Sequence, residues 1–429
     1  MSTAHPAPGL TSTTFRLSDP GEVTPERIDG WFEAQSRGFH QGRTSEEQRT
    51  HFRAHIEADD VLLRGIWQDR PALGSGAMPV ATYSSYDKTL NVGGGRMLPL
   101  RMISDVTVSP AHRRQGLLRS MITQDLSEAA DQGVPLAGLT VSEGSIYGRF
   151  GFGLATHRRH VEVDTTSRFA LRGADDDGSI ELVEPVEAWP AMRSVFAAFH
   201  ERTRGSVERP QFYETILTGA FDFESGPDKK LRTAVHLDAD ERPDGYVAYK
   251  PGDRKDGIRT LEVVDLVALT PAAYLRLWRF LADIDLAQRV AWHEAPVDDP
   301  LAWALVDPFV AAVTKVSDVL WVRVLDVVAA LEARAWGADG AVVLEVTDPL
   351  EHATGRFRVT ATGGGARVSP TGDEPGVRLE ADTLGALYLG GVRAETLRSA
   401  GRVSGDPQAL DTWAAMVDAG PAPYCLTHF

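Results

Sequence analysis

The first third of the chain alternates between stretches with helical and with strand-like spacing of apolar residues. Pro25–Arg37 and Ser45–Ala58 carry apolar residues every three or four positions, a spacing that predicts two amphipathic helices. The runs Val61–Trp67 and Met78–Tyr86 are alternating or continuously apolar and predict strands, and Gly93–Gly95 predicts a turn. This part of the chain therefore begins with helices that precede a sheet.

A strand, a helix and a second strand follow in close succession. The first strand is predicted at Ile103–Val108, the helix at Gly116–Gln132 and the second strand at Leu136–Val141. Two strands joined through a helix of this length are typical of a parallel crossover unit. We therefore expect an α/β arrangement here.

A second region, from Ile180 to about Pro308, repeats this pattern. Strands are predicted at Tyr246–Lys250 and Leu261–Leu269, and a helix follows. The apolar face of that helix consists of Tyr274, Leu277, Trp278 and Leu281. Where the first unit has an Arg-rich turn with a glycine, this one has Thr270-Pro271-Ala272. We interpret the region as a duplicated fold whose ligand-binding turn has been lost.

The last region has a different pattern, typical of an α+β domain. Its predicted strands form a meander with a hairpin turn at Gly363–Gly365, and helical segments follow. The strands are Ala341–Val346, Arg356–Thr362 and Arg367–Pro370, and the helices lie around Thr383–Leu389, Ala394–Ala400 and Pro407–Val417. A short tail, Pro421–Phe429, follows the last helix. We divide the chain into a flexible N-terminal tail (1–13), a first domain (14–172), its copy (173–310) and the α+β domain (311–429).

The composition is that of a globular protein with a strong acidic excess. The 429 residues include 44 Lys and Arg against 60 Asp and Glu, a formal net charge of −16, so we expect no nucleic-acid partner. No run approaches about 18 apolar residues and no basic-then-apolar leader is visible, so we expect no membrane span and a cytoplasmic location. The single Cys425 excludes a disulfide framework. We expect no metal site, and we interpret His51 and His55 as a solvent-facing pair.

The strongest chemical signal lies between the first crossover strand and its helix. The strand ends at Pro110, and a basic turn with Arg113, Arg114 and Gly116 opens the helix. Cations at a helix N-terminus oppose the helix dipole, so they need a compensating anion. Free N–H groups and both guanidinium groups converge on one point, where a glycine lets the backbone approach a bulky group. The turn therefore predicts a site for a phosphate-bearing ligand.

The run Arg113-Arg114-Gln115-Gly116-Leu117-Leu118 resembles motif A of the GNAT acyltransferases, which bind acetyl-CoA, with Leu118 at a position usually occupied by a small residue. Together with the later run S-E-G-x-I-Y-G-R-F-G at residues 142–151, it makes the chain similar to the enhanced intracellular survival (Eis) family of acetyltransferases over nearly its whole length. The resemblance implies tandem GNAT-like domains, the second degenerate, followed by a C-terminal sterol-carrier-protein-like α+β domain. It also implies a homohexamer.

The resemblance further implies roles for individual residues. Tyr147 would be the general acid, and the α-carboxylate of the last residue, Phe429, would be the general base. A phenol can protonate a thiolate as it leaves, and a carboxylate can accept a proton from an amine. The backbone of Val106, Thr107 and Val108 would bind the pantetheine arm of acetyl-CoA. The remaining acetyl-CoA contacts would be Arg113, Arg114, Gln115, Gly116, Leu117, Leu118, Arg119, Ser142 and Glu143, and the amine contacts would be Phe39, His40, Gln41 and His428.

The implied activity is direct transfer of acetyl from acetyl-CoA, as a co-substrate, to an amine of a cationic small molecule of the aminoglycoside type. Lys side chains of peptides or proteins are alternative acceptors. A different class also stays open, namely a non-catalytic lipid- or CoA-binding protein with a vestigial GNAT site. Because Phe39, His40 and Gln41 are neutral, we expect the attraction for a cation to come from Glu33 and from the overall charge.

Overall fold

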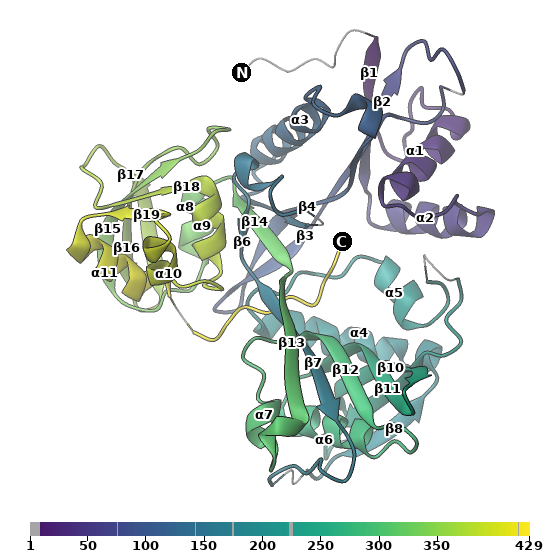
Figure 1. Cartoon of the computed structure of the whole chain (residues 1–429). Coiled ribbons are helices and arrows are strands. Elements are labelled where there is room, and N and C mark those ends of the chain that lie inside the picture. Colours follow the sequence, from purple (N-terminus) through teal and green to yellow (C-terminus); the bar gives the residue numbers. More distant parts are fainter. Residues whose placement is uncertain (1–8, 75, 142, 174–175, 223–225, 419) are drawn as a thin grey trace.

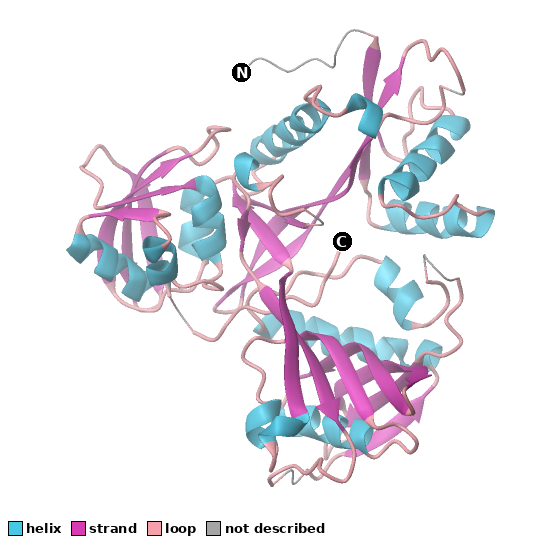
Figure 2. Ribbon diagram, in the orientation of Figure 1, coloured by secondary structure: helices cyan, strands magenta, loops and turns pink. Residues whose placement is uncertain are grey.

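The computed structural model describes residues 9–74, 76–141, 143–173, 176–222, 226–418 and 420–429. These residues form three parts, each built on one β-sheet with helices against it (Figures 1 and 2). The C-terminal end of the chain lies between the first two parts (Figure 1). None of the helices within these ranges is long and apolar enough to cross a bilayer.

Seven strands form the first sheet, in the order β1-β2-β3-β4-β5-β14-β6. Within its described strands only β4 and β5 run parallel, and Leu100–Ile103 is aligned there with Leu136–Leu139. The strands are β1 (Leu10–Phe15), β2 (Leu62–Gln68), β3 (Ala81–Gly93), β4 (Arg96–Val108), β5 (Leu136–Thr140), β6 (Gly153–Leu154) and β14 (Leu320–Val324). The expected parallel crossover is thereby confirmed.

Helices cover both faces of this sheet because successive residues of a strand point to opposite sides. Met102 belongs to the same apolar cluster as residues of α1 (Pro25–Gly38), whereas its neighbour Ile103 belongs to the cluster of α3 (Leu117–Asp131). Beside α1 lies α2 (Glu46–Ala58) (Figure 1). The three helices expected from the spacing of apolar residues are confirmed to within one residue at each end.

The second sheet also has seven strands, in the order β13-β7-β12-β11-β10-β9-β8. They are β7 (His157–Asp164), β8 (Ser179–Val183), β9 (Arg232–Leu237), β10 (Pro243–Lys255), β11 (Ile258–Ala268), β12 (Arg289–Ala295) and β13 (Ala311–Asp318). The helices are α4 (Pro185–Arg202), α5 (Phe212–Leu217), α6 (Pro271–Ala282) and α7 (Leu301–Ala304). As in the first sheet, a helix, here α6, joins two parallel strands, β11 and β12.

The chain exchanges strands between these two sheets. β7 follows the first part directly but pairs with β12, and β14 follows the second part but pairs with β5. The domain boundaries expected at residues 172 and 310 therefore do not separate the two sheets, since β7 precedes the first boundary and β14 follows the second. Strands that pair in a sheet need not be neighbours in the sequence. The expected loose tail needs correction as well. Residues 10–13 belong to β1, which is paired with β2, while residues 1–8 lie outside the described part.

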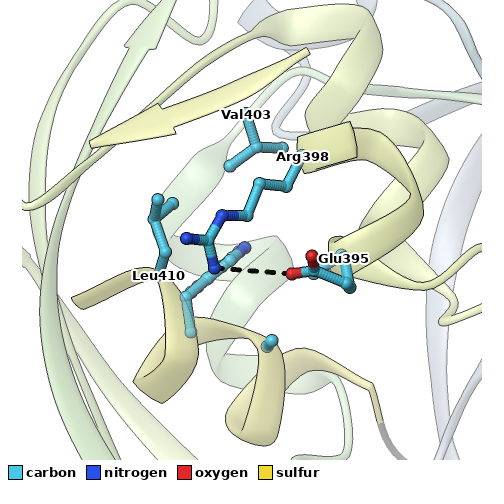
Figure 3. Close-up of a pocket in the computed structure, with 7 residues that line it drawn as sticks. Glu395, Arg398, Val403 and Leu410 are labelled. Carbon is cyan, nitrogen blue, oxygen red and sulfur yellow. Dashed lines mark hydrogen bonds and ion pairs between the residues drawn. The ribbon is translucent and has the colours of Figure 1, made fainter. Parts of the chain in front are cut away.

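The third part is an α+β unit with the strand order β17-β16-β15-β18-β19. Its elements are α8 (Val327–Ala333), β15 (Gly340–Thr347), β16 (Gly355–Thr362), β17 (Gly365–Pro370), β18 (Val377–Glu380), α9 (Ala381–Tyr388), α10 (Ala394–Ser399), β19 (Val403–Gly405) and α11 (Pro407–Val417). The expected meander is present as β15, β16 and β17. A hollow between α10 and α11, lined by Arg398 and Leu410 among others, is too narrow to admit a water molecule (Figure 3). This hollow therefore has no room for a lipid.

Candidate functional site

The first sheet opens where β4 and β5 separate. Their parallel pairing ends at Ile103 and Leu139, although β4 continues to Val108. A register shift in the pairing with β3 and a positive φ of 52° at Asp105 mark a β-bulge that bends β4 at this point. Beyond the bulge, Val106 and Val108 pack against the core under α3. Among the described residues, no strand pairs with the backbone edge of this segment that faces β5.

Helix α3 begins at the end of this segment with an uncapped N-terminus. The chain passes through a short 3₁₀ turn, η1 (Pro110–His112), and reaches left-handed conformations at Arg114 (φ 63°) and Gly116 (φ 78°). Gly116 is the N-cap and provides no side chain to accept from the helix. The N–H groups of the first turn are therefore available to an anion.

The charges around this helix start are also unpaired. Arg113, Arg114 and Arg119 are exposed, and within the described chain none of them has an ion-pair partner. The guanidinium of Arg119 lies over the Phe150 ring at 5.8 Å. A Cβ placed on Gly116 would meet no atom within 4 Å, so the space in front of the turn is open. The turn therefore fits a large anion such as a pyrophosphate.

Other residues expected at this site are arranged around the turn. Gln115 is exposed, Leu117 is buried in the core, and Leu118 packs partly against it, so the two leucines offer a ligand mainly their backbone. Thr107 directs its hydroxyl to that of Thr82 at 2.6 Å. Glu143 is exposed, and Ser142 lies outside the described residues.

A buried ionic network fixes α3 on the sheet. The carboxylate of Asp125, on the inner face of α3, is fully buried and accepts from Arg64 at 2.7 Å and from Ser85 at 2.6 Å. Arg101 and Tyr83 donate to it at 3.1 and 2.9 Å. Nothing in the spacing of apolar residues indicated this network, because Asp125 simply interrupts the apolar stripe of the helix.

A cavity of about 260 Å³ lies on the opposite side of the bulge. Most of its lining is aromatic or aliphatic, and three groups on it can carry negative charge. The lining residues are Trp31, Phe32, Gln35, Gln41, Phe52, His55, Ile56, Asp59, Val61, Tyr86, Ser104, Asp105, Phe212 and Phe429. Helices α1 and α2, strand β4 and the C-terminal end of the chain therefore meet around one space.

Two aspartates line this cavity, and one of them, Asp105, has no basic partner within the described chain. Asp105 accepts from Ser84 Oγ at 2.7 Å and from Gln35 Nε2 at 3.2 Å, and burial raises the pKa of its carboxyl above the usual range. Asp59 accepts from Lys88 Nζ at 2.6 Å. The expected acceptor contacts Phe39, His40 and Gln41 are neutral, but the cavity itself also has the carboxyl group of Asp105 on its wall. No pattern of residues indicated a role for Asp105, because only the bulge brings it to the cavity.

The C-terminal residue is firmly held at the opening of the sheet. Thr140, the last residue of β5, donates its hydroxyl to the terminal backbone oxygen of Phe429 at 2.5 Å. The Phe429 ring packs against the large apolar cluster of the first and third parts and lines the cavity. The terminal carboxylate therefore lies where β4 and β5 diverge.

Tyr147 lies at the start of the 3₁₀ turn η2 (Gly148–Phe150) and packs against the apolar cluster under α3. Its ring packs edge-on against Phe152 with 6.2 Å between ring centroids. Burial, and secondly the charge of Glu143, raise the pKa of Tyr147 to about 12. Its phenol is therefore protonated at neutral pH and able to donate a proton.

The residues expected at the amine do not all meet the cavity. Gln41 lines it, whereas Phe39 is 41% exposed at the end of α1 and His40 is exposed with a φ of 61°. The imidazole of His428 lies 2.9 Å from a carboxylate oxygen of Glu294, in the second part.

The interpretation of His51 and His55 as a solvent-facing pair is wrong. His55 lines the cavity, and its Nε2 lies 2.8 Å from Thr215 Oγ1. Burial, and secondly the charge of His51, lower the pKa of His55 to about 4. His51 stacks on Phe221 with 4.4 Å between ring centroids. Packing between α2 and the second part covers this face of the helix.

Comparison with family models matches all three parts. Residues 20–155 and residues 205–324 each match a model described as an acetyltransferase (GNAT) domain. Residues 327–426 match a model described as a sterol carrier protein domain. The expected fold, with tandem GNAT domains and a C-terminal sterol-carrier-like domain, is confirmed.

Individual proteins extend the similarity over most of the chain. The N-acetyltransferase Eis of Mycobacterium tuberculosis is 36% identical over 366 residues, which cover 83% of this chain and 86% of that protein. An uncharacterized N-acetyltransferase of Streptomyces avermitilis is 37% identical over 363 residues, covering 82% of this chain and 86% of that protein. The crystal structure of Eis1 from Mycobacterium abscessus superposes with a TM-score of 0.81 at 29% identity, covering 98% of this chain and all of that one. These similarities identify an acetyltransferase.

Proposed function

Because the chain belongs to the Eis family of GNAT N-acetyltransferases, we propose that it transfers acetyl from acetyl-CoA to an amine of a cationic small molecule of the aminoglycoside type. The observation that carries the proposal is that Asp105, which has no basic partner within the described chain, and the C-terminal residue Phe429 meet at one aromatic cavity. Carboxylates attract a polyamine, and aromatic faces also favour cations. The cavity thus suits a small acceptor with several ammonium groups.

GNAT acetyltransferases use acetyl-CoA, and the start of α3 has the features such a ligand requires. The guanidinium groups of Arg113, Arg114 and Arg119 offset the phosphate charges, and the free N–H groups of the first helical turn bind phosphate oxygens. The unpaired edge of Val106–Val108 offers backbone groups to the amide-containing arm, in the manner of a neighbouring strand. Binding there would direct the thioester towards the opening between β4 and β5.

The chemistry needs one base and one acid. A thioester supplies an acetyl carbon on which the amine nitrogen forms a new C–N bond as the C–S bond breaks. The Phe429 carboxylate takes the proton that the amine loses, and a carboxylate in partly apolar surroundings is a stronger base than one in water. Tyr147 donates its phenolic proton to the leaving sulfur. Transfer is direct, and no covalent enzyme intermediate is formed.

A thiol-release assay tests the proposal. The chain is mixed with acetyl-CoA and, in separate reactions, with aminoglycosides, simple polyamines and Lys-containing peptides. We expect thiol release with the aminoglycosides and little with the peptides, because the narrow, acidic cavity favours a compact polycation. The variant Arg113→Glu/Arg114→Glu is the control that removes the proposed acetyl-CoA site. Release with peptides alone would favour Lys acetylation, and no release with any amine would favour a non-catalytic binding protein.

The family resemblance also supports a homohexamer that works in the cytoplasm. Trp303 of α7 and Phe309 of η3 (Pro308–Val310) are 87% and 88% exposed. Both precede β13, an edge strand of the second sheet, in the chain. Large exposed apolar groups beside a free strand edge are typical of contacts between subunits. Light scattering of the native chain and of Trp303→Glu/Phe309→Glu tests this assembly, and an unchanged mass in the variant would place the contacts elsewhere.

A further inference from the structure

The last residues of the chain run across the second GNAT domain before they reach the active site of the first. Residues 420–429 contain no helix or strand, yet Leu426 is 3% exposed and Thr427 is completely buried. Thr427 donates its hydroxyl to the carbonyl of Val207 at 2.6 Å. A segment without its own secondary structure must satisfy its backbone through neighbouring groups. These neighbours belong largely to the second domain.

One side chain, Tyr213 of α5, bonds to two backbone groups within the last four residues of the chain. Its hydroxyl donates to the carbonyl of Leu426 at 3.2 Å and accepts from the N–H of His428 at 2.8 Å. A hydroxyl has one proton to donate and lone pairs to accept with, so both bonds form at the same time. The hydroxyl thereby fixes the direction of the chain immediately before the terminal residue.

Tyr213 is itself rigidly placed. Its ring stacks on Phe212 at 5.0 Å, and the guanidinium of Arg209 lies 4.5 Å from the ring centroid. Arg209 is held in turn by Asp265 of β11 at 2.8 Å. Burial raises the pKa of Tyr213 well above its usual value, so the hydroxyl keeps the proton that it donates. The groups that hold the Tyr213 ring therefore come from the second domain, although α5 also contacts α2 through Thr215 and His55.

The side chain of His428 is held from the same domain. Its Nε2 lies 2.9 Å from Glu294 Oε2, and Arg158 forms an ion pair with the same carboxylate. Burial would raise the pKa of Glu294, but the hydrogen bonds from His428 and Arg158 outweigh it and lower the pKa. Residue 428 is therefore held at its backbone and at its ring, and the freedom left to the terminal carboxylate is small.

We propose that Tyr213 is a positioning residue of the acetyl transfer, through which the second GNAT domain aims the Phe429 carboxylate at the opening of the first. The inference rests on the proposed function, in which that carboxylate is the base. Displacement of a reacting group by about 1 Å can lower a rate by as much as 10²-fold. The domain that lost its own ligand turn therefore takes part in the reaction of its neighbour.

The test is a double-mutant cycle with the full-length protein. Tyr213→Phe removes only the hydroxyl, and one Gly added after Phe429 moves the carboxylate. We expect Tyr213→Phe to lower kcat by about 10- to 100-fold, with KM for acetyl-CoA within about twofold. In the extended chain, whose own kcat is reduced by about 10²-fold or more, we expect Tyr213→Phe to change kcat by less than about twofold.

Tyr388→Phe is the matched control, because it removes a buried hydroxyl that donates to the carbonyl of Ala330 in the third domain. It should leave kcat unchanged. Equal losses from Tyr213→Phe in the native and the extended chain would overturn the positioning role while leaving the base in place. Full activity of the extended chain would overturn the base and, with it, the inference. If Tyr213→Phe does not fold, Glu294→Gln takes its place in the same cycle, with the same two outcomes.

Discussion

Helices α3 and α6 occupy equivalent places in the two GNAT sheets, each joining a pair of parallel strands, but their N-termini are built differently. α3 starts at Gly116 without a side-chain cap and with exposed arginines around it. α6 starts at Thr270, whose hydroxyl accepts from the N–H of Ala273 and donates to Asp244, each at 3.1 Å. A helix N-terminus attracts an anion, and at α6 the chain supplies one itself. The two domains share the fold. A site for an external anion is open only at α3, because its N-cap, Gly116, has no side chain to accept from the first-turn N–H groups.

The bulged strands before these helices show the same contrast. Asp105 of β4 faces the cavity, and within the described chain no basic side chain pairs with it. Asp265 of β11 also lies next to a register shift but forms an ion pair with Arg209. The carboxyl group in the first domain therefore has no ion-pair partner within the described chain, whereas its counterpart in the second domain is paired with an arginine.

The openings of the two sheets differ in what fills them. Phe429 reaches the opening of the first sheet with its carboxylate. At the second sheet, Tyr424 packs against an apolar cluster that includes Val267 of β11, and its hydroxyl donates to the backbone carbonyl of Glu294 at 2.5 Å. One C-terminal segment therefore packs on the second sheet through Tyr424 and reaches the opening of the first sheet with Phe429.

The largest effect is expected from Tyr147→Phe. Because the variant cannot protonate the leaving thiolate, kcat should fall by about 10²–10⁴-fold. The control is Tyr274→Phe on α6, which removes a buried hydroxyl that donates to Asp299. It should keep kcat within about twofold. Steady-state kinetics at saturating acetyl-CoA and amine measure both variants. A loss of only a few-fold for Tyr147→Phe would make this tyrosine structural.

Arg114→Glu places a carboxylate near the N-terminus of α3. In the native chain Asp244 already lies at the N-terminus of α6, where it accepts from the Thr270 hydroxyl. Loss of a charge-assisted contact and gain of a repulsive one should raise KM for acetyl-CoA by about 30- to 100-fold. The value of kcat at saturation should stay within about threefold. Arg193→Glu, at an exposed position of α4, is the matched charge reversal and should change neither parameter. Similar kinetics for both variants would show that the turn at α3 does not bind the phosphates.

Asp105→Asn removes the carboxylate of the first domain. Its counterpart in the second domain, Asp265, is paired with Arg209. We expect KM for a polyamine acceptor to rise about tenfold, with KM for acetyl-CoA unchanged. Because burial raises the pKa of Asp105, folding favours its protonated form. Stability from this group is therefore present below about pH 4 and is lost as the pH rises through the raised value.

Melting temperatures of Asp105→Asn and the native chain, compared across pH, check this sign. The difference in favour of the variant should grow from acid to neutral pH. Asparagine accepts a positive φ as readily as aspartate does, so the bulge itself is preserved. A difference that shrinks towards neutral pH would mean that the ionised carboxylate is stabilised in the fold.

The smallest effect on activity is expected from Thr270→Ala, which uncaps α6. Loss of the N-cap should lower the free energy of unfolding by about 1 kcal/mol, measured by urea denaturation. The kinetic parameters should not change, because no residue of the proposed active site lies on α6. A clear fall in kcat would show that the second domain contributes more to the reaction than the contacts of Tyr213 and Glu294 with the C-terminal residues.

Many of the helices, strands and turns could be predicted from local patterns in the sequence. The start of α1 at Pro25 follows from the Thr24 cap, and the turn at Gly116 follows from a pattern of charge and glycine. The tandem architecture came from the resemblance of two motifs to a known family. Roles that the resemblance assigns to Tyr147 and Phe429 stay predictions until they are measured.

Contacts between residues far apart in the chain could not be predicted from the sequence. The pairing of β14 with β5 joins segments about 180 residues apart, and local periodicity holds no record of it. The acidic lining depends on a bulge that brings Asp105 to the cavity, and Asp59 looks like an ordinary turn residue in the sequence. Packing and register, which propensities do not specify, decide both.

The strand exchange between the two GNAT sheets has a consequence for synthesis on the ribosome. β5 lies between β4 and β14, so one of its edges stays open until Val324 has been added and has left the exit tunnel. Open strand edges invite pairing with other chains, and distant pairings form slowly. Neither GNAT domain can therefore mature cotranslationally as a separate unit. A fragment that stops near residue 155 would expose β5 and should aggregate rather than fold.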